Sequence, residues 1–318
     1  MKKNISPITD SSIRAASVKQ FSQQINVNTL DEITSYQYSA NSLKSMVNDW
    51  NHFVSFCAEN SVASLPASIA AVKGFLIKES SKKKFASIRR CCLTIGTIHR
   101  VHSYSDPTNH RQIKFLLSEL RLQKHGDSKS VRAFTSEHLY DLYNLLSSSI
   151  LAKDIRDLAI YCVMFECALK RSELRGMKMD NIGFKNEIAI IHLGDKVYEL
   201  SINSSLALRK WISKNDTSIL FCRIDKHENL YESTLDDSSI YRIFRRGSQL
   251  LGLSGRERFS GQSSRIGAVK ELASQGYKLK EIQDFGRWLS PAMPAQYLGK
   301  LGTADKEKLK FVTIKPWD

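Results

Sequence analysis

The sequence predicts a mainly α-helical protein made of two domains. Its 318 residues exceed the usual size of one domain, and 42% of them are hydrophobic, enough to give each domain a core. Apolar residues recur at helical spacing in most segments, and only two short stretches have the character of strands. A polar segment containing Gly, Ser and Lys, QKHGDSKSVRAF at 123–134, separates two such regions. It is expected to be a linker, either a plain surface loop or a basic segment that lies along DNA.

The first region is expected to be a small all-helical unit preceded by an arm. Residues 1–35 are polar and weakly patterned, which predicts a flexible N-terminal arm, and four helices follow over 36–122. Ser42 is the expected N-cap of the first helix. The third helix, in KKKFASIRRCCLTIGTIHRVH, has an apolar stripe on one side and a basic side that predicts contact with DNA. The residues of this basic side are Lys82, Lys83, Arg89, Arg90 and Arg100.

The second region, 135–318, is expected to be mostly helical with one small antiparallel sheet. Thr135 is a suitable N-cap, and the stretches NEIAIIHLG and KVYELSI predict two strands joined by a tight GDK turn. The helices of this region are expected at about 136–149, 154–168, 204–214, 234–251, 264–276, 279–286 and 291–299.

The charge balance indicates a polyanionic partner. Lys and Arg number 47 against 32 Asp and Glu, a net charge of +15. Nucleic acid is the first candidate, an anionic membrane surface the second, and a merely solvated basic surface the third. The basic residues are clustered, which favours a bound polyanion over a merely solvated surface. The clusters include KKKFASIRR, FRRG and GRERF. The sequence has no run of 18 apolar residues, so no membrane span is predicted. The N-terminal stretch MKKNISPITDSS lacks the apolar core of a secretory signal.

The six cysteines predict a cytoplasmic protein with reduced thiols and no zinc site. They form no CxxC pair and fall mostly at apolar helical positions. No histidines stand near them at finger-like spacing.

Three short motifs hold residue types that suit chemistry at a phosphate. ALKRSEL places Lys170 and Glu173 at the edge of a helix that begins buried, which fits either a structural salt bridge or a phosphate contact oriented by Glu173. SGQSSRIGA contains Arg265, and GRW contains Trp288. Tyr297 follows that tryptophan by nine residues (297 − 288 = 9).

In order and spacing, these motifs resemble those of the tyrosine recombinases of the phage integrase superfamily, and within it the Cre-like group. DIRDLA before the first motif and ILFCRI between the motifs match as well, and the likeness spans nearly the whole chain. The resemblance implies a SAM-like helical core-binding domain at 36–122, which binds DNA, and a catalytic domain at 135–318. It further implies DNA integration or excision for a mobile genetic element, by a homotetramer on paired sites in double-stranded DNA.

The resemblance also implies a role for each matching residue. Tyr297 matches the nucleophile that forms a 3′-phosphotyrosyl link. Arg265 matches the second phosphate-clamping arginine, and Trp288 the position whose ring N–H hydrogen-bonds the phosphate. Lys196 matches the lysine that protonates the leaving 5′-oxygen, although lysines in hairpin turns are commonly just solvated. Glu173 matches the supporting acid.

Two positions depart from the family pattern. Lys170 stands where the family has its first clamping arginine, and Gln262 where it has a histidine. Lysine keeps the charge but lacks the planar fork, and glutamine donates a hydrogen bond but neither accepts a proton nor holds charge. Arg171 is a poor substitute, because adjacent helical residues point about 100° apart. The site is therefore expected to be slow or conditionally active. Arg287 is expected to be a surface residue or a DNA backbone contact.

The main hypothesis is thus a site-specific DNA recombinase. The alternative, motivated by the two departures, is a DNA-binding accessory factor that recruits or activates another recombinase. A type IB topoisomerase-like relaxing enzyme ranks below both. No cofactor is expected, because the covalent intermediate conserves the energy of the phosphodiester bond. The sequence also has neither a GxxxxGK[ST] loop nor an acidic metal cluster.

The tail after Tyr297 is expected to dock on a neighbouring subunit, with packing inside its own chain or disorder as alternatives. Its apolar anchors would be Leu301, Leu309, Phe311 and Val312.

Overall fold

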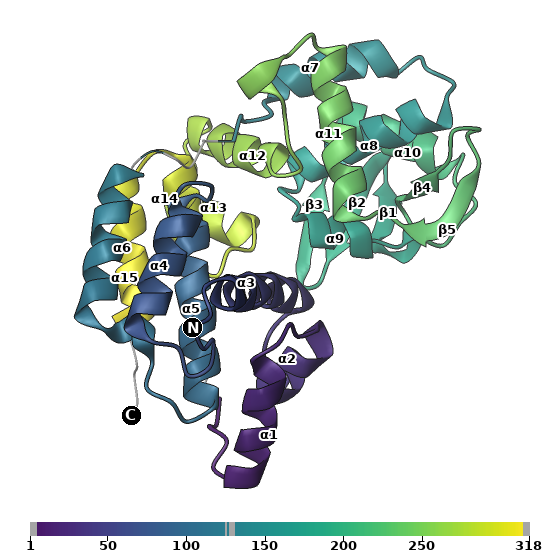
Figure 1. Cartoon of the computed structure of the whole chain (residues 1–318). Helices are drawn as coiled ribbons and strands as arrows, with labels where there is room; N and C mark the ends of the chain where they lie inside the picture. Colours follow the sequence, from purple (N-terminus) through teal and green to yellow (C-terminus); the bar gives the residue numbers. More distant parts are fainter. Residues whose placement is uncertain (1–4, 125, 127–130, 314–318) are drawn as a thin grey trace. The chain divides into compact units, whose positions relative to one another are not determined.

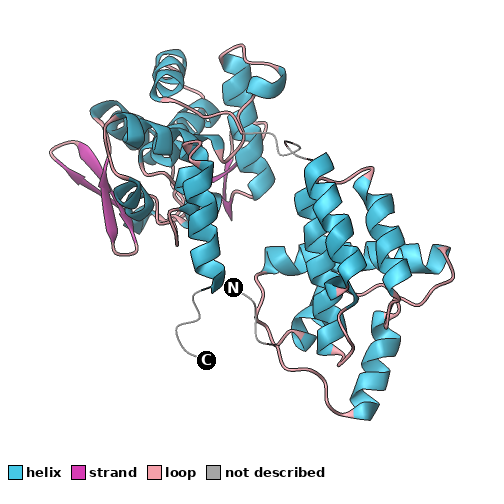
Figure 2. Cartoon of the chain, turned by 90° about the vertical axis from the view of Figure 1, so that its left-hand side faces the viewer, coloured by secondary structure: helices cyan, strands magenta, loops and turns pink. Residues whose placement is uncertain are grey.

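The computed structural model describes residues 5–124, 126 and 131–313, with side chains as far as residue 307. The chain divides into two compact units, Met1–Lys129 and Ser130–Asp318 (Figure 1). The predicted fold class is confirmed, because both units are mainly helical and the strands of the described residues all belong to the second unit (Figure 2). Part of the linker expected at 123–134 lies outside the described residues.

The first unit is a bundle of α-helices around one apolar core. The largest fully buried side chains of this core include Trp50, Phe53 and Phe75, which come from the predicted helical stripes. The expected N-cap at Ser42 is wrong, because the helix begins one turn earlier and the hydroxyl of Ser39 accepts a hydrogen bond from the amide of Ser42. The helices are α1 Ser11–Phe21, α2 Val27–Ile33, α3 Ala40–Glu59, α4 Ile69–Ser80, α5 Phe85–Val101 and α6 Arg111–Gln123.

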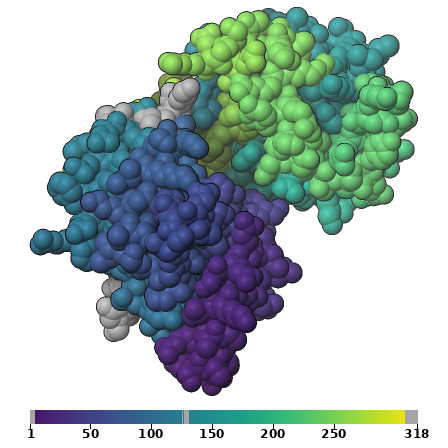
Figure 3. All heavy atoms as spheres, in the orientation of Figure 1, coloured from purple at the N-terminus to yellow at the C-terminus, as the bar shows by residue number. Residues whose placement is uncertain are grey.

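Residues 5–35, the described part of the segment that the sequence predicted as a flexible arm, are mostly helical. They contain α1 and α2, each begun by a polar side chain that caps the first turn. Phe21 and Leu30 are fully buried, and the indole N–H of Trp50 donates to the carbonyl of Phe21 at 3.1 Å. In Figure 3 the purple atoms of this segment lie directly against the blue atoms of the helices that follow. A few apolar anchors therefore fix a segment whose overall composition is polar.

The second unit is organised around α8, a helix that is buried on nearly all sides. Helix α10 packs along α8, and α12 packs against it as well. The helices of this unit are α7 Ser136–Leu146, α8 Ala152–Glu166, α9 Arg171–Gly176, α10 Ile202–Ile212, α11 Asp237–Leu250, α12 Ser263–Ser274, α13 Leu279–Phe285, α14 Ala292–Tyr297 and α15 Leu301–Thr313.

The described part of the second unit has two antiparallel sheets where the sequence predicted one. The expected hairpin is present as β2 Ile188–Leu193 and β3 Lys196–Glu199. A third strand, β1 Ile182–Lys185, pairs with the other side of β2. The second sheet pairs β4 Cys222–Ile224 with β5 Leu230–Thr234. Its strands are short and their register shifts after Cys222, so the sequence shows no clean alternation there.

The tail after Tyr297 forms α15, which packs against α14. Ala304 is fully buried and Leu301 is exposed. The side chains of Leu309, Phe311 and Val312 lie outside the described residues, so docking of the tail on a neighbouring subunit stays a prediction.

Candidate active site

The C-terminal end of α8 begins the candidate site. Ala168 takes a left-handed conformation (φ 45°) after the helix, and the amide of Leu169 closes the turn by donating to the carbonyl of Met164 at 3.1 Å. This turn leads directly into α9, whose N-cap is Lys170. A carboxylate oxygen of Glu173 accepts a hydrogen bond from the amide of Lys170 at 2.7 Å, which fixes the first turn of α9.

Glu173 joins two cations. Its carboxylate lies 3.2 Å from Nζ of Lys170 and accepts hydrogen bonds from Nε and an NH2 group of Arg287 at 3.0 and 2.8 Å. Burial alone would raise the pKa of Glu173, but the bonds from Arg287 and from the amide of Lys170 lower it to about 2. The carboxylate is therefore charged at neutral pH. The side chain of Lys170 remains 45% exposed.

Arg265, in the first turn of α12, is only 5% exposed. Its guanidinium donates to the carbonyls of Ala168 and Gly286, which follow the C-terminal ends of α8 and α13. Cations are favourable at helix C-termini, because unpaired carbonyls point outward there. Burial lowers the pKa of Arg265 to about 10, so its side chain stays charged at neutral pH.

Arg265 and Tyr297 meet at the ring of Trp288. The guanidinium carbon of Arg265 lies 3.8 Å from the ring centroid, a cation–π contact. The ring of Tyr297 approaches the same indole edge-on, with centroids 6.3 Å apart. Gln262 donates a hydrogen bond from Nε2 to the hydroxyl oxygen of Tyr297 at 2.8 Å. Burial raises the pKa of Tyr297 although Gln262 and Arg265 act in the opposite direction, so the phenol is protonated at neutral pH.

Gly286 makes room for this arrangement. A Cβ atom at Gly286 would lie 1.7 Å from the six-membered ring of Trp288, far inside van der Waals contact. The indole therefore lies directly over the backbone of Gly286, and any side chain at this position would displace it.

Arg287 is not the surface residue or DNA contact that the sequence predicted. Its side chain is 14% exposed and pairs with Glu173. It also donates to the hydroxyl of Tyr198 and to carbonyls at the ends of α8 and α13. The prediction failed because the partner of Arg287 lies 114 residues away in the sequence.

Tyr198 connects strand β3 to this cluster. Its hydroxyl donates to the carbonyl of Phe285 at 2.6 Å and accepts a hydrogen bond from Arg287. Lys196 lies two residues earlier on the same strand and hence on the same face as Tyr198. No hydrogen bond or ion pair among the described residues links Lys196 itself to the cluster.

Comparisons with known proteins show the family of the chain. The model of the phage integrase family matches residues 132–301, more than half of the chain. The chain belongs to the phage integrase family. The recombinase Cre of Escherichia phage P1 is 22% identical over 316 residues, covering 90% of this chain and 92% of Cre. The resemblance to Cre-like tyrosine recombinases noted from the motifs is thereby confirmed.

Solved structures of tyrosine recombinases share the fold of this integrase-family chain. The XerH site-specific recombinase bound to its difH substrate, in a pre-cleavage complex, has a TM-score of 0.62 at 14% identity, covering 95% of this chain and 90% of XerH. The Tn1549 transposon integrase in complex with transposon right-end DNA has a TM-score of 0.63 at 10% identity, covering 92% of this chain and 99% of that one.

The third predicted helix corresponds to α5. Three of the five basic residues that the sequence predicted as DNA contacts there form ion pairs within the protein instead. Arg90 donates from Nε and an NH2 group to buried Asp49 at 2.7 and 2.9 Å, and Arg100 donates to Asp106. Lys83 is paired with Glu79 at 2.5 Å. The remaining two predicted DNA contacts, Lys82 and Arg89, are exposed.

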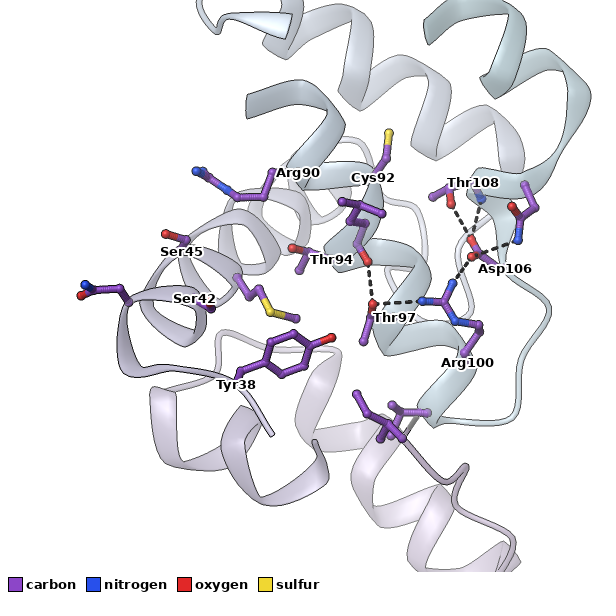
Figure 4. Close-up of a pocket in the computed structure, with 16 residues that line it drawn as sticks. Tyr38, Ser42, Ser45, Arg90, Cys92, Thr94, Thr97, Arg100, Asp106 and Thr108 are labelled. Atoms are coloured by element: carbon purple, nitrogen blue, oxygen red, sulfur yellow. Dashed lines mark hydrogen bonds and ion pairs between the residues drawn. The ribbon is translucent and has the colours of Figure 1, made fainter. Parts of the chain in front are cut away.

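A hollow of about 630 Å³ lies beside α5 within the first unit. Figure 4 shows Arg100 in this hollow, turned toward Asp106 and Thr97 rather than into open space. Hydroxyl groups, among them those of Tyr38 and Ser42, line the opposite side. The hollow contains none of the residues that form the cluster around Arg265.

The described residues show three further features. All six cysteines are free and buried. Among the described residues there is no group of three or more side chains of the kinds that bind a metal ion. Every described helix is too short or too polar to cross a bilayer.

The sequence missed two members of the cluster, Arg287 and Tyr198. The helix-end rule did not point to Arg287, because it places glycine in the left-handed position, whereas here Arg287 follows Gly286 and takes that position. Tyr198 had no clear signal either, since KVYEL reads only as an ordinary strand.

Proposed function

We propose that this integrase-family protein is a site-specific recombinase that cleaves and rejoins double-stranded DNA through Tyr297. The carrying observation is that Tyr297 and Arg265 lie against the same tryptophan ring, with Gln262 hydrogen-bonded to the tyrosine hydroxyl. A nucleophile and a buried cation converge there, as cleavage of a phosphodiester requires. The DNA complexes of related XerH and Tn1549 enzymes support DNA as the substrate.

The proposed reaction exchanges one ester bond for another. The hydroxyl oxygen of Tyr297 attacks the scissile phosphorus, a new bond forms from phosphorus to that oxygen, and the bond to the 5′-oxygen breaks. The phenol releases its proton to solvent water, and the departing 5′-oxygen gains a proton, for which Lys196 is the candidate donor. Rejoining reverses these steps with a different 5′-hydroxyl. Because the phosphotyrosyl bond conserves the energy, no cofactor is consumed.

Arg265, Trp288 and Lys170 are the proposed phosphate-binding groups. Two donor groups of Arg265 cap helix ends, and a guanidinium has five N–H donors, which leaves donors for phosphate oxygens. Among the described residues, nothing accepts a hydrogen bond from the indole N–H of Trp288. Lys170 supplies a single compact charge in place of a fork, and Gln262 supplies a neutral donor.

The deciding experiment is covalent trapping. The protein's own site is recovered by sequencing the DNA that it protects, and a nicked suicide substrate carrying that site is incubated with the purified chain. We expect a covalent protein–DNA adduct from the natural chain and none from Tyr297→Phe. The absence of any adduct from the natural chain would overturn the proposed function.

The Lys170 and Gln262 departures favour a second candidate, a DNA-binding accessory factor that recruits or activates another recombinase. Both candidates bind DNA, so binding does not separate them. They differ in the trapping experiment, and also in Lys170→Arg. Under the first proposal this variant restores the planar fork and raises the rate of adduct formation, whereas an accessory factor forms no adduct in either form.

Assembly belongs to the same proposal. Strand exchange needs two sites, and we infer a homotetramer on paired sites with the α15 tail docked between subunits. Sedimentation of the protein with and without its site DNA tests this assembly, and a species that stays monomeric on paired sites would contradict it.

A further inference from the structure

The backbone at Arg287 takes a conformation that is unfavourable for arginine. Helix α13 ends in a Schellman turn. The amide of Arg287 donates to the carbonyl of Asp284 at 3.3 Å, and the amide of Trp288 donates to the carbonyl of Gln283 at 3.0 Å. Arg287 occupies the left-handed position of this turn (φ 57°), where glycine is usual because it has no Cβ. The structure thus holds arginine in a conformation that glycine adopts more easily.

The side chain of Arg287 uses every N–H donor that it has. Nε and one NH2 donor bind the two oxygens of Glu173, the other NH2 group reaches Tyr198 and the carbonyl of Phe285, and the last donor is shared between the carbonyls of Cys167 and Ala168. A guanidinium has five such donors. Arg287 therefore has none left for a phosphate, and any effect on the reaction must pass through its partners.

Two of those partners lead to the proposed phosphate-binding cations. Glu173, gripped by Arg287, is 3.2 Å from Nζ of Lys170. The carbonyl of Ala168 accepts hydrogen bonds from both Arg265 and Arg287. Arg287 is thus in contact with the supports of both cations.

Charge makes this contact consequential. Lys170 and Glu173 alone form a neutral pair, because the lysine ammonium and the carboxylate cancel. With Arg287 paired to the same carboxylate, the three side chains carry a net charge of +1. The lysine then retains attraction for an incoming phosphate instead of being cancelled by its neighbour.

We propose that Arg287 is a positioning residue that makes Lys170 an effective phosphate-binding cation by holding and neutralising Glu173. This inference rests on the proposed function. It explains how a chain with lysine in the first motif retains a charged grip on the phosphate. Arg287 supplies a partly buried guanidinium charge beside Glu173, while the side chain of Lys170 remains 45% exposed.

The test measures adduct formation on the nicked suicide substrate at saturating protein. Arg287→Gly removes the guanidinium and suits the left-handed backbone, and we expect the rate to fall about tenfold or more with DNA affinity little changed. Arg287→Lys keeps a charge but not the two-pronged bond, so we expect a loss of about threefold. The double variant Arg287→Gly with Glu173→Gln should recover part of the loss, since a neutral glutamine cannot cancel Lys170.

Glu187→Gly is the matched control. Glu187 is also a charged residue in the left-handed region (φ 70°), but it is exposed in the β1–β2 turn. We expect it to cleave at the natural rate. If Arg287→Gly is unfolded, Arg287→Lys decides instead.

The outcomes separate this inference from the function on which it rests. Cleavage at the natural rate by Arg287→Gly, or by Arg287→Lys when the glycine variant is unfolded, would overturn the inference and leave the recombinase proposal intact. A loss that Glu173→Gln does not relieve would make Arg287 a structural residue only and overturn the inference as well. No adduct from the natural chain would overturn both together.

Discussion

The basic helix α5 and the cluster around Arg265 both concentrate arginines, but they pair them with different partners. In α5, Arg90 is bonded to the buried carboxylate of Asp49 and Arg100 to that of Asp106. In the cluster, Arg265 donates to two main-chain carbonyls at helix ends. Both arrangements fix a guanidinium in place, yet a carboxylate cancels its charge and a carbonyl does not.

This difference distinguishes the two groups of arginines more sharply than exposure does. Arg90 and Arg100 are exposed and looked like DNA contacts in the sequence, whereas Arg265 is 5% exposed. Helix C-termini orient a guanidinium through partial charges, so more of its charge stays available to an anion than beside a carboxylate. The larger positive potential for a phosphate is therefore expected at the buried arginine.

The largest expected effect comes from Arg265→Gln. Glutamine can donate to one helix-end carbonyl but carries no charge, so we expect adduct formation on bound DNA to fall by roughly 10²- to 10³-fold, the scale of losing one preorganised donor. Arg209→Gln is the control, because its guanidinium stacks on Phe184, 4.2 Å from the ring centroid, in the same unit. If Arg265→Gln forms adduct at a rate within about threefold of the natural chain, the charge of Arg265 does not contribute to cleavage and the contrast with α5 fails.

Gly286→Ala should follow in size. The added methyl group collides with Trp288 and displaces the ring that Arg265 and Tyr297 share. We expect the adduct rate to fall about tenfold or more, and overpacking to lower the free energy of unfolding by about 1–3 kcal/mol. Gly176→Ala provides the control, since nothing lies within 4 Å of a Cβ there. A variant with natural stability and rate would show that the indole can move without cost.

Much of the fold and part of the site were predictable because their signals are local. Apolar residues at helical spacing predicted α3 and α8, and a tight turn between two apolar stretches predicted the β2–β3 hairpin. Tyr297, Trp288, Arg265 and Gln262 lie within one stretch of 36 residues (297 − 262 + 1 = 36), so sequence motifs could point to all four.

The remainder depends on contacts that no local pattern records. Arg287 pairs with a carboxylate 114 residues earlier. Its left-handed backbone also follows from packing: the helix-end glycine, Gly286, is needed under Trp288, and the left-handed position passes to the next residue. Helices α1 and α2 were missed because a few buried side chains, such as Phe21 and Leu30, anchor an otherwise polar segment.

Arg90→Ala tests the other half of the comparison. It would leave the carboxylate of Asp49, which is fully buried, without its partner. We expect the free energy of unfolding in urea to fall by about 2 kcal/mol and the cleavage rate of bound DNA to stay unchanged. The double variant Asp49→Asn with Arg90→Ala should recover part of this stability. An Arg90→Ala protein of natural stability that binds DNA much more weakly would instead make Arg90 a DNA contact.

The smallest expected effect belongs to Arg89→Ala, on the same helix as Arg90. Arg89 is exposed, and its removal leaves no carboxylate buried without a partner, so we expect the free energy of unfolding to change by less than about 0.5 kcal/mol. If Arg89 contacts one DNA phosphate, the slope of log affinity against log salt should become shallower by about one, with affinity reduced a few-fold at moderate salt. Measuring both variants across a salt series distinguishes the two kinds of arginine on one helix: the paired one changes stability and the unpaired one changes the salt dependence. An unchanged slope for Arg89→Ala would mean that α5 does not contact the DNA backbone at this position. The exposed positive charge of the helix would then contribute to solubility instead of DNA binding.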